Sequence, residues 1–224
     1  MSELLNIDNL ELMSRYPNNF FDLAIVDPPY FDGPQKRKYY GSSVSTTSVK
    51  RREYHISPPE YWITPTKKYF DELFRVSKNQ IVWGCNYFHY EFPGSGRIVW
   101  DKCNGNNTFS DCEIAYCSLH ESVRLFRFMW NGMMQGRSAD EGHIMQGNKK
   151  LNEKRIHPTQ KPVALYEWSL KRYAKPGDII LDTHVGSGSS LIACERLGFE
   201  YVGCEIDPYY FAAASERIAK ERDT

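Results

Sequence analysis

The sequence predicts an α/β fold with a doubly wound, mostly parallel sheet. Short apolar runs that suit strands alternate with stretches of helical periodicity, most regularly after residue 162, and this order is typical of parallel sheets with helices on both faces. The length of 224 residues suits one domain spanning 1–224. Hydrophobic residues make up 41% and charged residues 25%, which indicates a globular chain rather than a disordered one.

The N-terminal part begins with two candidate strands and a helix between them. Residues 4–7 suit a short strand, and Asp8-Asn9 offers a cap for a helix that continues to about residue 16. The apolar run 21–26 predicts a strand that stops at the double proline after it, because proline cannot donate to a ladder. Residues 31–64 lack steady periodicity and are rich in Gly, Pro, Ser and Thr, which predicts a long, mobile loop.

The remaining elements follow from apolar periodicity. A helix is predicted over 66–78, followed by strands over 81–84, 97–100, 113–117 and 124–128 and by a second polar loop over 132–153. The last part alternates regularly, with a helix over 163–173, a strand over 179–182, a helix over 189–197, a strand over 201–205 and a helix over 209–220.

Bulk properties exclude several classes of protein. The six cysteines form no C-x-x-C pair, so neither a structural zinc site nor a disulfide framework is expected. No apolar stretch approaches the roughly 20 residues that cross a bilayer, and no signal peptide opens the chain, which predicts a cytoplasmic protein. The 28 basic and 28 acidic residues balance, so any nucleic-acid surface has to come from local clustering.

A glycine-rich turn near the C-terminus indicates a ligand site. Gly186-Ser187-Gly188 lies between a predicted strand and a predicted helix, where glycines let the backbone approach a ligand and the helix presents free N–H groups. The next strand ends at Glu205, the position at which doubly wound nucleotide-binding folds place an acid that holds both ribose hydroxyls. A tight turn before a helix is the alternative interpretation of the glycines, and Asp207 suits a helix cap.

A second motif, Asp27-Pro28-Pro29-Tyr30, directly follows the predicted strand over 21–26. Together with Asp182-Thr183-His184-Val185-Gly186-Ser187-Gly188-Ser189 it resembles the two signature motifs of S-adenosylmethionine-dependent amino methyltransferases that methylate adenine N6 in DNA. The catalytic motif precedes the cofactor motif, as in the permuted β group of that family and its compact phage-type members, which implies the cytoplasm of a bacterial or phage-infected cell. The resemblance implies a Rossmann-like methyltransferase fold with circularly permuted motif order, and S-adenosyl-L-methionine as the cofactor.

The resemblance extends to His157-Pro158-Thr159-Gln160-Lys161-Pro162, which is similar to the family's H-P-T-x-K-P segment around the methionine end of the cofactor. The family usually has Pro-Phe where this chain has Thr183-His184, and Thr where it has Ser189. Asp8 stands where the family contacts the adenine edge of the cofactor, with helix capping as an equal alternative. The cofactor-binding residues that the resemblance implies are Asp8, Thr159, Gln160, Lys161, Asp182, His184, Gly186, Ser187, Gly188, Ser189 and Glu205.

The resemblance makes Asp27, Pro28, Pro29 and Tyr30 the catalytic residues. An exocyclic amine is a weak nucleophile because its lone pair is delocalised into the ring. Asp27 can accept one amino hydrogen and the Pro28 carbonyl the other, which localises and directs the lone pair without any metal. Tyr30 can stack on a base that is flipped out of the duplex. The aspartate favours adenine, since cytosine N4 enzymes of the family usually carry Ser there.

Basic residues mixed with aromatics follow the catalytic motif within the loop over 31–64. This composition suits phosphate contact and base stacking, which makes the loop a candidate substrate loop, although charge runs are more often solvated surface. The segment 118–156 is a small candidate insert for target recognition, whose size implies short target sites, low specificity or recognition shared with a second subunit. The nucleic-acid-binding candidates are Lys36, Arg37, Lys38, Tyr39, Lys50, Arg51 and Arg52.

Two other functions compete with methylation of DNA adenine. Methylation of adenine in RNA uses the same pocket chemistry, since the sequence does not reveal whether a 2′-hydroxyl is recognised. A catalytically inactive nucleic-acid-binding partner subunit is the alternative from another class, although such a copy has no need of intact Asp27, Gly186 and Glu205. Restriction–modification, phage protection and regulatory methylation all fit the sequence, as do a homodimer and a complex with a partner subunit.

Overall fold

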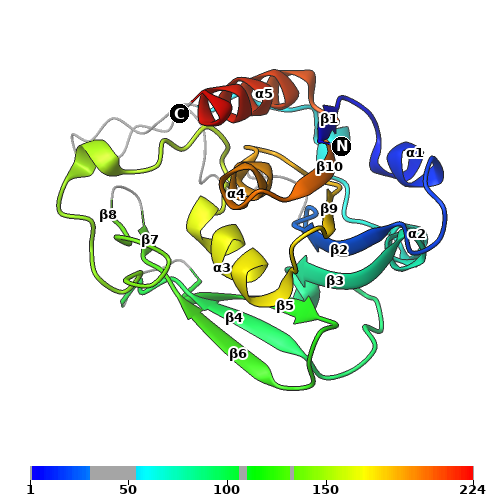
Figure 1. Ribbon diagram of the computed structural model, residues 1–224, viewed down its shortest axis with the longest axis horizontal. Coiled ribbons are helices and arrows are strands. Elements are labelled where there is room, and N and C mark those ends of the chain that lie inside the picture. Colours follow the sequence, from blue (N-terminus) through cyan, green and yellow to red (C-terminus); the bar gives the residue numbers. More distant parts are fainter. Residues whose placement is uncertain (1, 31–53, 106–109, 132–133, 224) are drawn as a thin grey trace.

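The core of the protein is an eight-stranded sheet with helices on both faces (Figure 1). The computed structural model describes residues 2–30, 54–105, 110–131 and 134–223, and within them the strand order is β1-β10-β9-β2-β3-β5-β4-β6. The predicted α/β class with a mostly parallel sheet is confirmed. No helix in the described ranges is long and apolar enough to cross a membrane.

The strands of the main sheet are, in chain order, β1 (Glu3–Leu5), β2 (Phe21–Val26), β3 (Ser77–Trp83), β4 (Arg97–Asp101), β5 (Cys112–Cys117), β6 (Val123–Arg127), β9 (Ile179–Asp182) and β10 (Glu200–Cys204). The α-helices are α1 (Asn9–Ser14), α2 (Lys67–Val76), α3 (Val163–Tyr173), α4 (Ser189–Leu197) and α5 (Pro208–Arg222). A separate antiparallel pair consists of β7 (Trp130–Asn131) and β8 (Met134–Gln135). Short 3-10 turns cover Pro59–Trp62, Cys85–Tyr87 and Lys149–Leu151.

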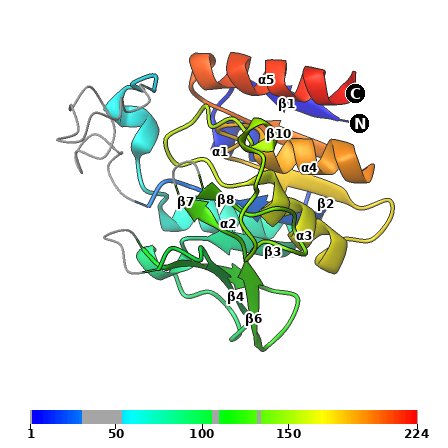
Figure 2. The same ribbon diagram turned by 90° about the vertical axis from the view of Figure 1, so that its left-hand side faces the viewer.

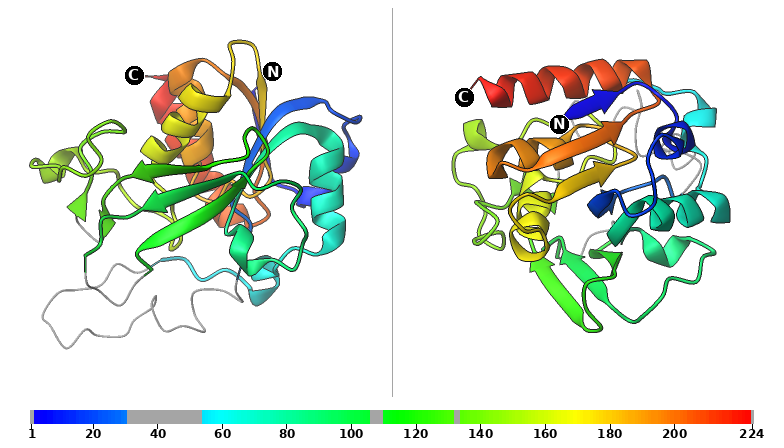
Figure 3. Two further views of the ribbon diagram at one scale, coloured as in Figure 1. Left: turned by 90° about the horizontal axis from the view of Figure 1, so that it is seen from below. Right: turned by 45° about the vertical axis from the view of Figure 1, so that its right-hand side comes forward.

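The sheet has a parallel half and a mixed half. Strands β1, β10, β9, β2 and β3 all pair in parallel, and they lie side by side under α5 and beside α2 (Figure 3). Strand β5 then runs antiparallel to β3 and to β4, while β6 pairs in parallel with β4. This mixed half was not predicted, because local apolar periodicity marks a strand without marking its direction.

Two apolar layers enclose the sheet, one on each face. Helices α3, α4 and α5 pack on one face and α1 and α2 on the other (Figure 2). Strand β3 contributes to both layers: Ile81 and Trp83 belong to the first and Val82 to the second, and all three are fully buried. A strand covered on both faces therefore reads as one continuous apolar run.

The boundary between α2 and β3 differs from the sequence prediction. The helix ends at Val76 rather than continuing to Lys78, and the strand begins at once with Ser77 instead of residue 81. The reason is tertiary pairing, because Ser77 and Asn79 lie in register with Phe21 and Leu23 of β2. The polar start of β3 carries no strand pattern of its own, so the sequence could not reveal it.

The chain order along the sheet reverses between β9 and β2. From β2 the chain proceeds outward to β3, and from β9 it proceeds in the other direction to β10. Open α/β sheets bind ligands in the crevice outside the carboxyl ends of strands at such a point. Asp27 follows β2, Thr183 follows β9 and Glu205 follows β10, so motifs from distant parts of the sequence meet at one edge.

Gly203→Ala tests the packing beneath this edge. A Cβ atom at residue 203 would lie 2.7 Å from Val185 Cγ2 and 2.9 Å from Leu191 Cδ1, so we expect the free energy of unfolding to fall by about 1–3 kcal/mol. Urea denaturation followed by circular dichroism measures the change. Gly147→Ala is the control, because nothing lies within 4 Å of its added Cβ. Equal stability of the two variants would show that the turn after β9 repacks freely.

Candidate active site

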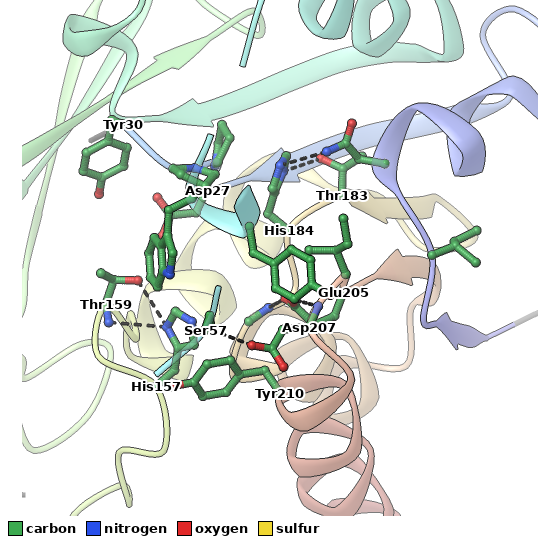
Figure 4. A pocket seen from close by; sticks show the side chains of 18 residues that line it. Asp27, Tyr30, Ser57, His157, Thr159, Thr183, His184, Glu205, Asp207 and Tyr210 are labelled. Atoms are coloured by element: carbon green, nitrogen blue, oxygen red, sulfur yellow. Dashed lines mark hydrogen bonds between the residues drawn. The ribbon is translucent and has the colours of Figure 1, made fainter. Parts of the chain in front are cut away.

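A cavity opens at the carboxyl ends of β1, β2, β9 and β10. Asp27 and Tyr30 lie toward one end of the cavity, and Asp207 and Tyr210 toward the other (Figure 4). The residues that line it are Ile7, Asn9, Asp27, Pro28, Pro29, Tyr30, Ser57, Tyr61, Trp62, His157, Thr159, Thr183, His184, Gly186, Glu205, Ile206, Asp207 and Tyr210.

Glu205 and the glycine turn form an acidic part of the cavity wall. Glu205 Oε2 accepts a hydrogen bond from the backbone N–H of Gly186 at 2.7 Å, and Oε1 accepts one from that of Asp207 at 2.9 Å. Burial raises the pKa of Glu205 to about 7. The two backbone hydrogen bonds lower this pKa, and the nearby carboxylates of Asp207 and Asp182 raise it. Two backbone groups thus orient the carboxylate, and each oxygen keeps a lone pair for a ligand.

His184 stands where the resembling family has an aromatic hydrocarbon. Its Nε2 lies 3.2 Å from the Asn9 side-chain nitrogen, and its Nδ1 lies 3.0 Å from the Thr183 hydroxyl. Burial lowers the pKa of His184 to about 3, so the ring is neutral. Because the Asn9 nitrogen can only donate, Nε2 accepts and Nδ1 carries the hydrogen. The wall is therefore a neutral imidazole that is held in one orientation from both sides.

Asp182 lies behind this wall, with 2% of its surface exposed, and does not line the cavity. Its Oδ1 accepts from the backbone N–H of His184 at 2.9 Å, and its Oδ2 accepts from the Ser190 hydroxyl. Burial raises the pKa of Asp182 to about 7, although these two hydrogen bonds lower it. Asp182 therefore ties the turn after β9 to the start of α4.

A buried cluster of charges surrounds Asp27 at the other end of the cavity. The Lys161 ammonium lies 2.6 Å from Asp27 Oδ2 and 2.8 Å from Glu113 Oε2, and it donates to the Tyr30 hydroxyl at 3.0 Å. The Tyr30 hydroxyl in turn donates to Glu113 Oε2 at 2.9 Å, and Lys102 lies 2.5 Å from Glu113 Oε1. Two lysines thus balance two carboxylates, and all four side chains are largely shielded from solvent.

The pKa values of the two carboxyl groups in this cluster are shifted in opposite directions. Burial would raise the pKa of Glu113, but Lys161 and Lys102 outweigh it and lower the value to about 2. Burial raises the pKa of Asp27 more than Lys161 lowers it, and the charge of Glu113 raises it further. Asp27 Oδ1 is buried and accepts no hydrogen bond from any residue that the structure describes. The cluster therefore presents one unsatisfied, comparatively basic oxygen beside the cavity.

Tyr30 is held on its ring as well as on its hydroxyl. Its ring stacks on that of Tyr87, with centroids 4.9 Å apart and planes 4° from parallel. Gly84, with φ of +71°, lies so close that a Cβ atom there would be 2.4 Å from the Tyr30 ring. The predicted stacking of Tyr30 on a base thus has to use the part of the ring that Tyr87 leaves open. Tyr87 is 45% exposed and belongs to the turn after β3.

Asp8 is placed outside the cavity by its role in α1. Its Oδ1 accepts from the backbone N–H groups of Leu10 at 2.8 Å and Glu11 at 3.2 Å, which is the capping alternative considered for it. The neighbouring Ile7 and Asn9 line the cavity instead. Gly188, with φ of +81°, begins α4 from the left-handed region that favours glycine.

The Glu153 carboxylate accepts hydrogen bonds from three side chains behind the cavity, two of which are predicted cofactor-binding residues. Its Oε1 accepts from Gln160 Nε2 at 2.7 Å, from Arg217 Nη2 at 3.0 Å and from the Ser189 hydroxyl at 3.4 Å. Its Oε2 accepts from the backbone N–H of Val163 at the start of α3, at 3.0 Å. Gln160 and Ser189 are therefore engaged away from the cavity, as is the Ser187 hydroxyl, which contacts Ser189 at 3.0 Å. Of the segment 159–161, Thr159 alone lines the cavity.

Residues 54–62, the described end of the predicted loop 31–64, form a wall that sequence reasoning missed. The Ser57 hydroxyl donates to Asp207 Oδ2 at 2.5 Å, and both side chains are buried. The Trp62 ring stacks on His157 with centroids 5.7 Å apart. The only sequence signal for these residues was their position in an aperiodic stretch near the catalytic motif. The nucleic-acid-binding candidates Lys36, Arg37, Lys38, Tyr39, Lys50, Arg51 and Arg52 lie outside the described residues.

Fold and site together define a class of protein: a doubly wound α/β protein with a cavity at the switch point and a partly buried Asp-Pro-Pro-Tyr motif at its end. Residues 21–216 match the DNA methylase family of N6 and N4 amino methyltransferases. The chain belongs to this family. The predicted resemblance to DNA amino methyltransferases is thereby confirmed, while the choice between N6 and N4 is not made by the match.

Individual relatives agree with this assignment. The type II methyltransferase M.HinfI of Haemophilus influenzae is 23% identical over 247 residues, which cover 97% of this chain and 68% of the relative. The structure of the M1.HpyAVI–SAM complex superimposes with a TM-score of 0.54 at 20% identity, covering 97% of this chain and all of that one. The cytosine-N4-specific PvuII DNA methyltransferase superimposes with a TM-score of 0.55 at 15% identity, covering 99% and 91%. At these identities the two structures support the fold alone.

Ser57→Ala tests whether residues 54–62 are fixed over the cavity by their bond to Asp207. Loss of one buried hydrogen bond is worth about 1 kcal/mol, so we expect the backbone amides of 54–62 to exchange with solvent several-fold faster. Hydrogen exchange read by mass spectrometry measures the rates. Ser215→Ala, which removes a hydroxyl bonded only to the Phe211 carbonyl within α5, should leave them unchanged. Unaltered exchange in Ser57→Ala would mean that the other contacts hold this wall, among them the hydrogen bond from the Tyr210 hydroxyl to the His55 carbonyl and the stacking of Trp62 on His157.

Proposed function

We propose that this protein transfers a methyl group from S-adenosyl-L-methionine to N6 of adenine in DNA. DNA methylation follows from the family, and the finer choice of adenine N6 is supported by Asp27, which stands where the family's cytosine N4 enzymes usually carry Ser. The observation that carries the proposal is the buried Asp27 oxygen that accepts no hydrogen bond, at the end of a cavity with an oriented acid elsewhere in its wall.

The residues present fit S-adenosylmethionine. Glu205, oriented by two backbone N–H groups, suits the two ribose hydroxyls, and the neutral His184 ring beside Asn9 suits a flat heterocycle or an aliphatic chain. The lining residue Thr159 offers a hydroxyl near the predicted methionine end. When bound, the cofactor supplies an electrophilic methyl group on its sulfonium sulfur.

The acceptor side is formed by Asp27 and its neighbours. Asp27 Oδ1 accepts one hydrogen of the exocyclic amine and the Pro28 carbonyl accepts the other, which turns the nitrogen lone pair toward the cavity. When the new N–C bond formed, the bond between the methyl group and the sulfonium sulfur would break, S-adenosylhomocysteine would leave as a neutral thioether, and the amine, now cationic, would lose one proton. Asp27 is suited to receive that proton at Oδ1, because burial raises its pKa while Lys161 keeps it charged until then.

Target recognition and assembly remain proposals. We assign phosphate contact to the basic clusters of the loop 31–64, and recognition to the segment 118–156, whose described part includes the exposed Lys149, Lys150 and Lys154. The small size of that segment supports short target sites or the sharing of recognition with a second copy or a partner subunit. RNA is the competing substrate, and nucleoside analysis of methylated DNA and total RNA discriminates between them.

Asp27→Ala tests the acceptor role. Loss of the oriented acceptor should reduce the methyl-transfer rate by a hundredfold or more, because the carboxylate acts as charge develops on the amine. Cofactor affinity measured by calorimetry should stay nearly unchanged. The control is Asp22→Ala in β2, the strand that leads to Asp27; it removes a carboxylate bonded to Lys78 and the Ile179 N–H and should keep activity in the folded fraction. Radiolabelled transfer to plasmid DNA should yield N6-methyldeoxyadenosine, and N4-methyldeoxycytidine in its place would refute the assigned base.

Glu205→Gln tests the ribose-binding role through its pH dependence. The folded-state pKa of Glu205 is raised to about 7, so the charged acceptor is present above that pH and is lost as the pH falls through it. Cofactor affinity of the wild type should therefore weaken several-fold between pH 8 and pH 6. Glu205→Gln should bind more weakly at pH 8, by roughly 1.5–3 kcal/mol, and show a flatter pH dependence. Calorimetry at both pH values measures this, and an unchanged slope in the variant would assign the titration to Asp182.

A further inference from the structure

Lys161 does not line the cavity, although the H-P-T-x-K-P resemblance makes it a candidate for binding the methionine carboxylate of the cofactor. Its side chain is 3% exposed, and its ammonium lies among Asp27 Oδ2, Glu113 Oε2 and the Tyr30 hydroxyl at 2.6, 2.8 and 3.0 Å. An ammonium group has three hydrogens. All three have acceptors in this arrangement, which leaves no donor for the carboxylate of a cofactor.

The contact between Lys161 and Asp27 matters because several acidic groups surround Asp27. Among the described residues, Lys161 is the cation that contacts Asp27, whereas the second lysine of the cluster, Lys102, contacts Glu113. The charge of Glu113 in β5 raises the pKa of Asp27, and the charge of Asp27 in turn raises the pKa of Asp182 at the end of β9. Within the described part of the chain, the hydroxyls of Tyr30, of Tyr69 on α2 and of Tyr166 on α3 also interact electrostatically with Asp27.

The contact also fixes which oxygen of Asp27 is available. Oδ2 is engaged by the ammonium, and Oδ1 is the oxygen that accepts no hydrogen bond from a described residue. Glu113 in turn holds the ammonium in place and is itself neutralised by Lys102 at 2.5 Å. The chain Lys102–Glu113–Lys161–Asp27 therefore runs from β4 and β5 to the catalytic motif, with alternating charges.

We propose that Lys161 is a positioning residue of the methyl-acceptor site, which holds Asp27 by Oδ2, leaves Oδ1 for the amino group of the base and keeps the carboxylate ionised. This inference rests on the proposed function, since it concerns how Asp27 receives the amine. It moves Lys161 from the cofactor side of the reaction to the acceptor side.

Lys161→Met tests the proposal through the pH dependence of single-turnover methyl transfer at saturating cofactor. Removal of an opposite charge next to a carboxyl group raises its pKa by about 1–3 units. Activity requires ionised Asp27, so the acid limb of the rate profile should move to higher pH by at least about one unit. Lys161→Arg restores the charge with a different geometry and should return the limb toward the wild-type position at a reduced rate. Lys102→Met, which removes only the distal lysine, should move the limb less.

Cofactor affinity separates the two assignments of Lys161. Under the acceptor-side role, calorimetry should give a dissociation constant for Lys161→Met within about threefold of wild type. A dissociation constant weakened tenfold or more, with an unmoved acid limb, would overturn the proposal in favour of contact with the methionine carboxylate. A wild type that methylates another base or RNA would refute the proposed function while leaving the shift of the limb interpretable.

Two measurements keep the test decisive if Lys161→Met folds poorly. The double variant Lys161→Met/Glu113→Gln removes one cation and one anion, so the net charge of the cluster stays zero, and it should still show a raised acid limb because Asp27 has lost its counter-ion. Carbon-13 NMR titration of the Asp27 carboxyl in the cofactor-free proteins reports on the same contact without any turnover. An Asp27 titration that is the same in wild type and in both variants would overturn the proposal.

Discussion

The pairing of β2 with β9 is the constraint on which the rest of the site depends. It joins two strands that are more than 150 residues apart in the chain, through the registers Leu23 to Ile180 and Ala24 to Leu181. Asp22 reinforces the junction, since its carboxylate accepts from the Ile179 N–H at 2.9 Å. Because both strands are parallel and end at the same edge, their next residues, Asp27 and Thr183, have to meet. A catalytic motif and a cofactor motif can thus stand in either chain order, provided that this junction forms.

Electrostatics at this edge is organised by burial rather than by net charge. The chain as a whole carries no net charge, yet a few side chains have pKa values far from the ordinary ones. The pKa of Glu113 is lowered so that it stays ionised, that of His184 is lowered so that it stays neutral, and that of Glu205 is raised to about 7. Each case has the same physical origin, since desolvation favours the uncharged form, while close partner charges and hydrogen bonds to the charged form oppose it. Glu113 has two lysines as partners and stays charged, whereas Glu205 has only backbone N–H groups.

The sequence predicted those features that are coded locally. The bounds of β2, α3, β9 and α4 follow from apolar runs and from flanking Pro and Gly, and the meeting of the two motifs follows from the rule for parallel sheets. Features that depend on long-range contacts could not be predicted in this way. The antiparallel direction of β5 and the polar start of β3 are set by their neighbours, and the partnership of Lys161 with Glu113 joins residues 48 positions apart in sequence that no periodicity relates.

Glu153 has a consequence for anyone who wishes to redesign the protein. Its carboxylate bonds the start of α3, Ser189 at the start of α4 and Arg217 in α5, so the segment that ends at Glu153 is clamped to three helices at once. The residues before it reach the same clamp through Gln135, whose side chain bonds the Glu153 backbone at 2.8 and 2.9 Å. A graft that exchanges residues 136–152 for a longer module therefore has a natural pair of attachment points, Gln135 and Glu153, which are already fastened together. The exchanged part includes Gly142, whose carbonyl accepts from the Met129 N–H at 2.8 Å, so a graft also has to restore this contact.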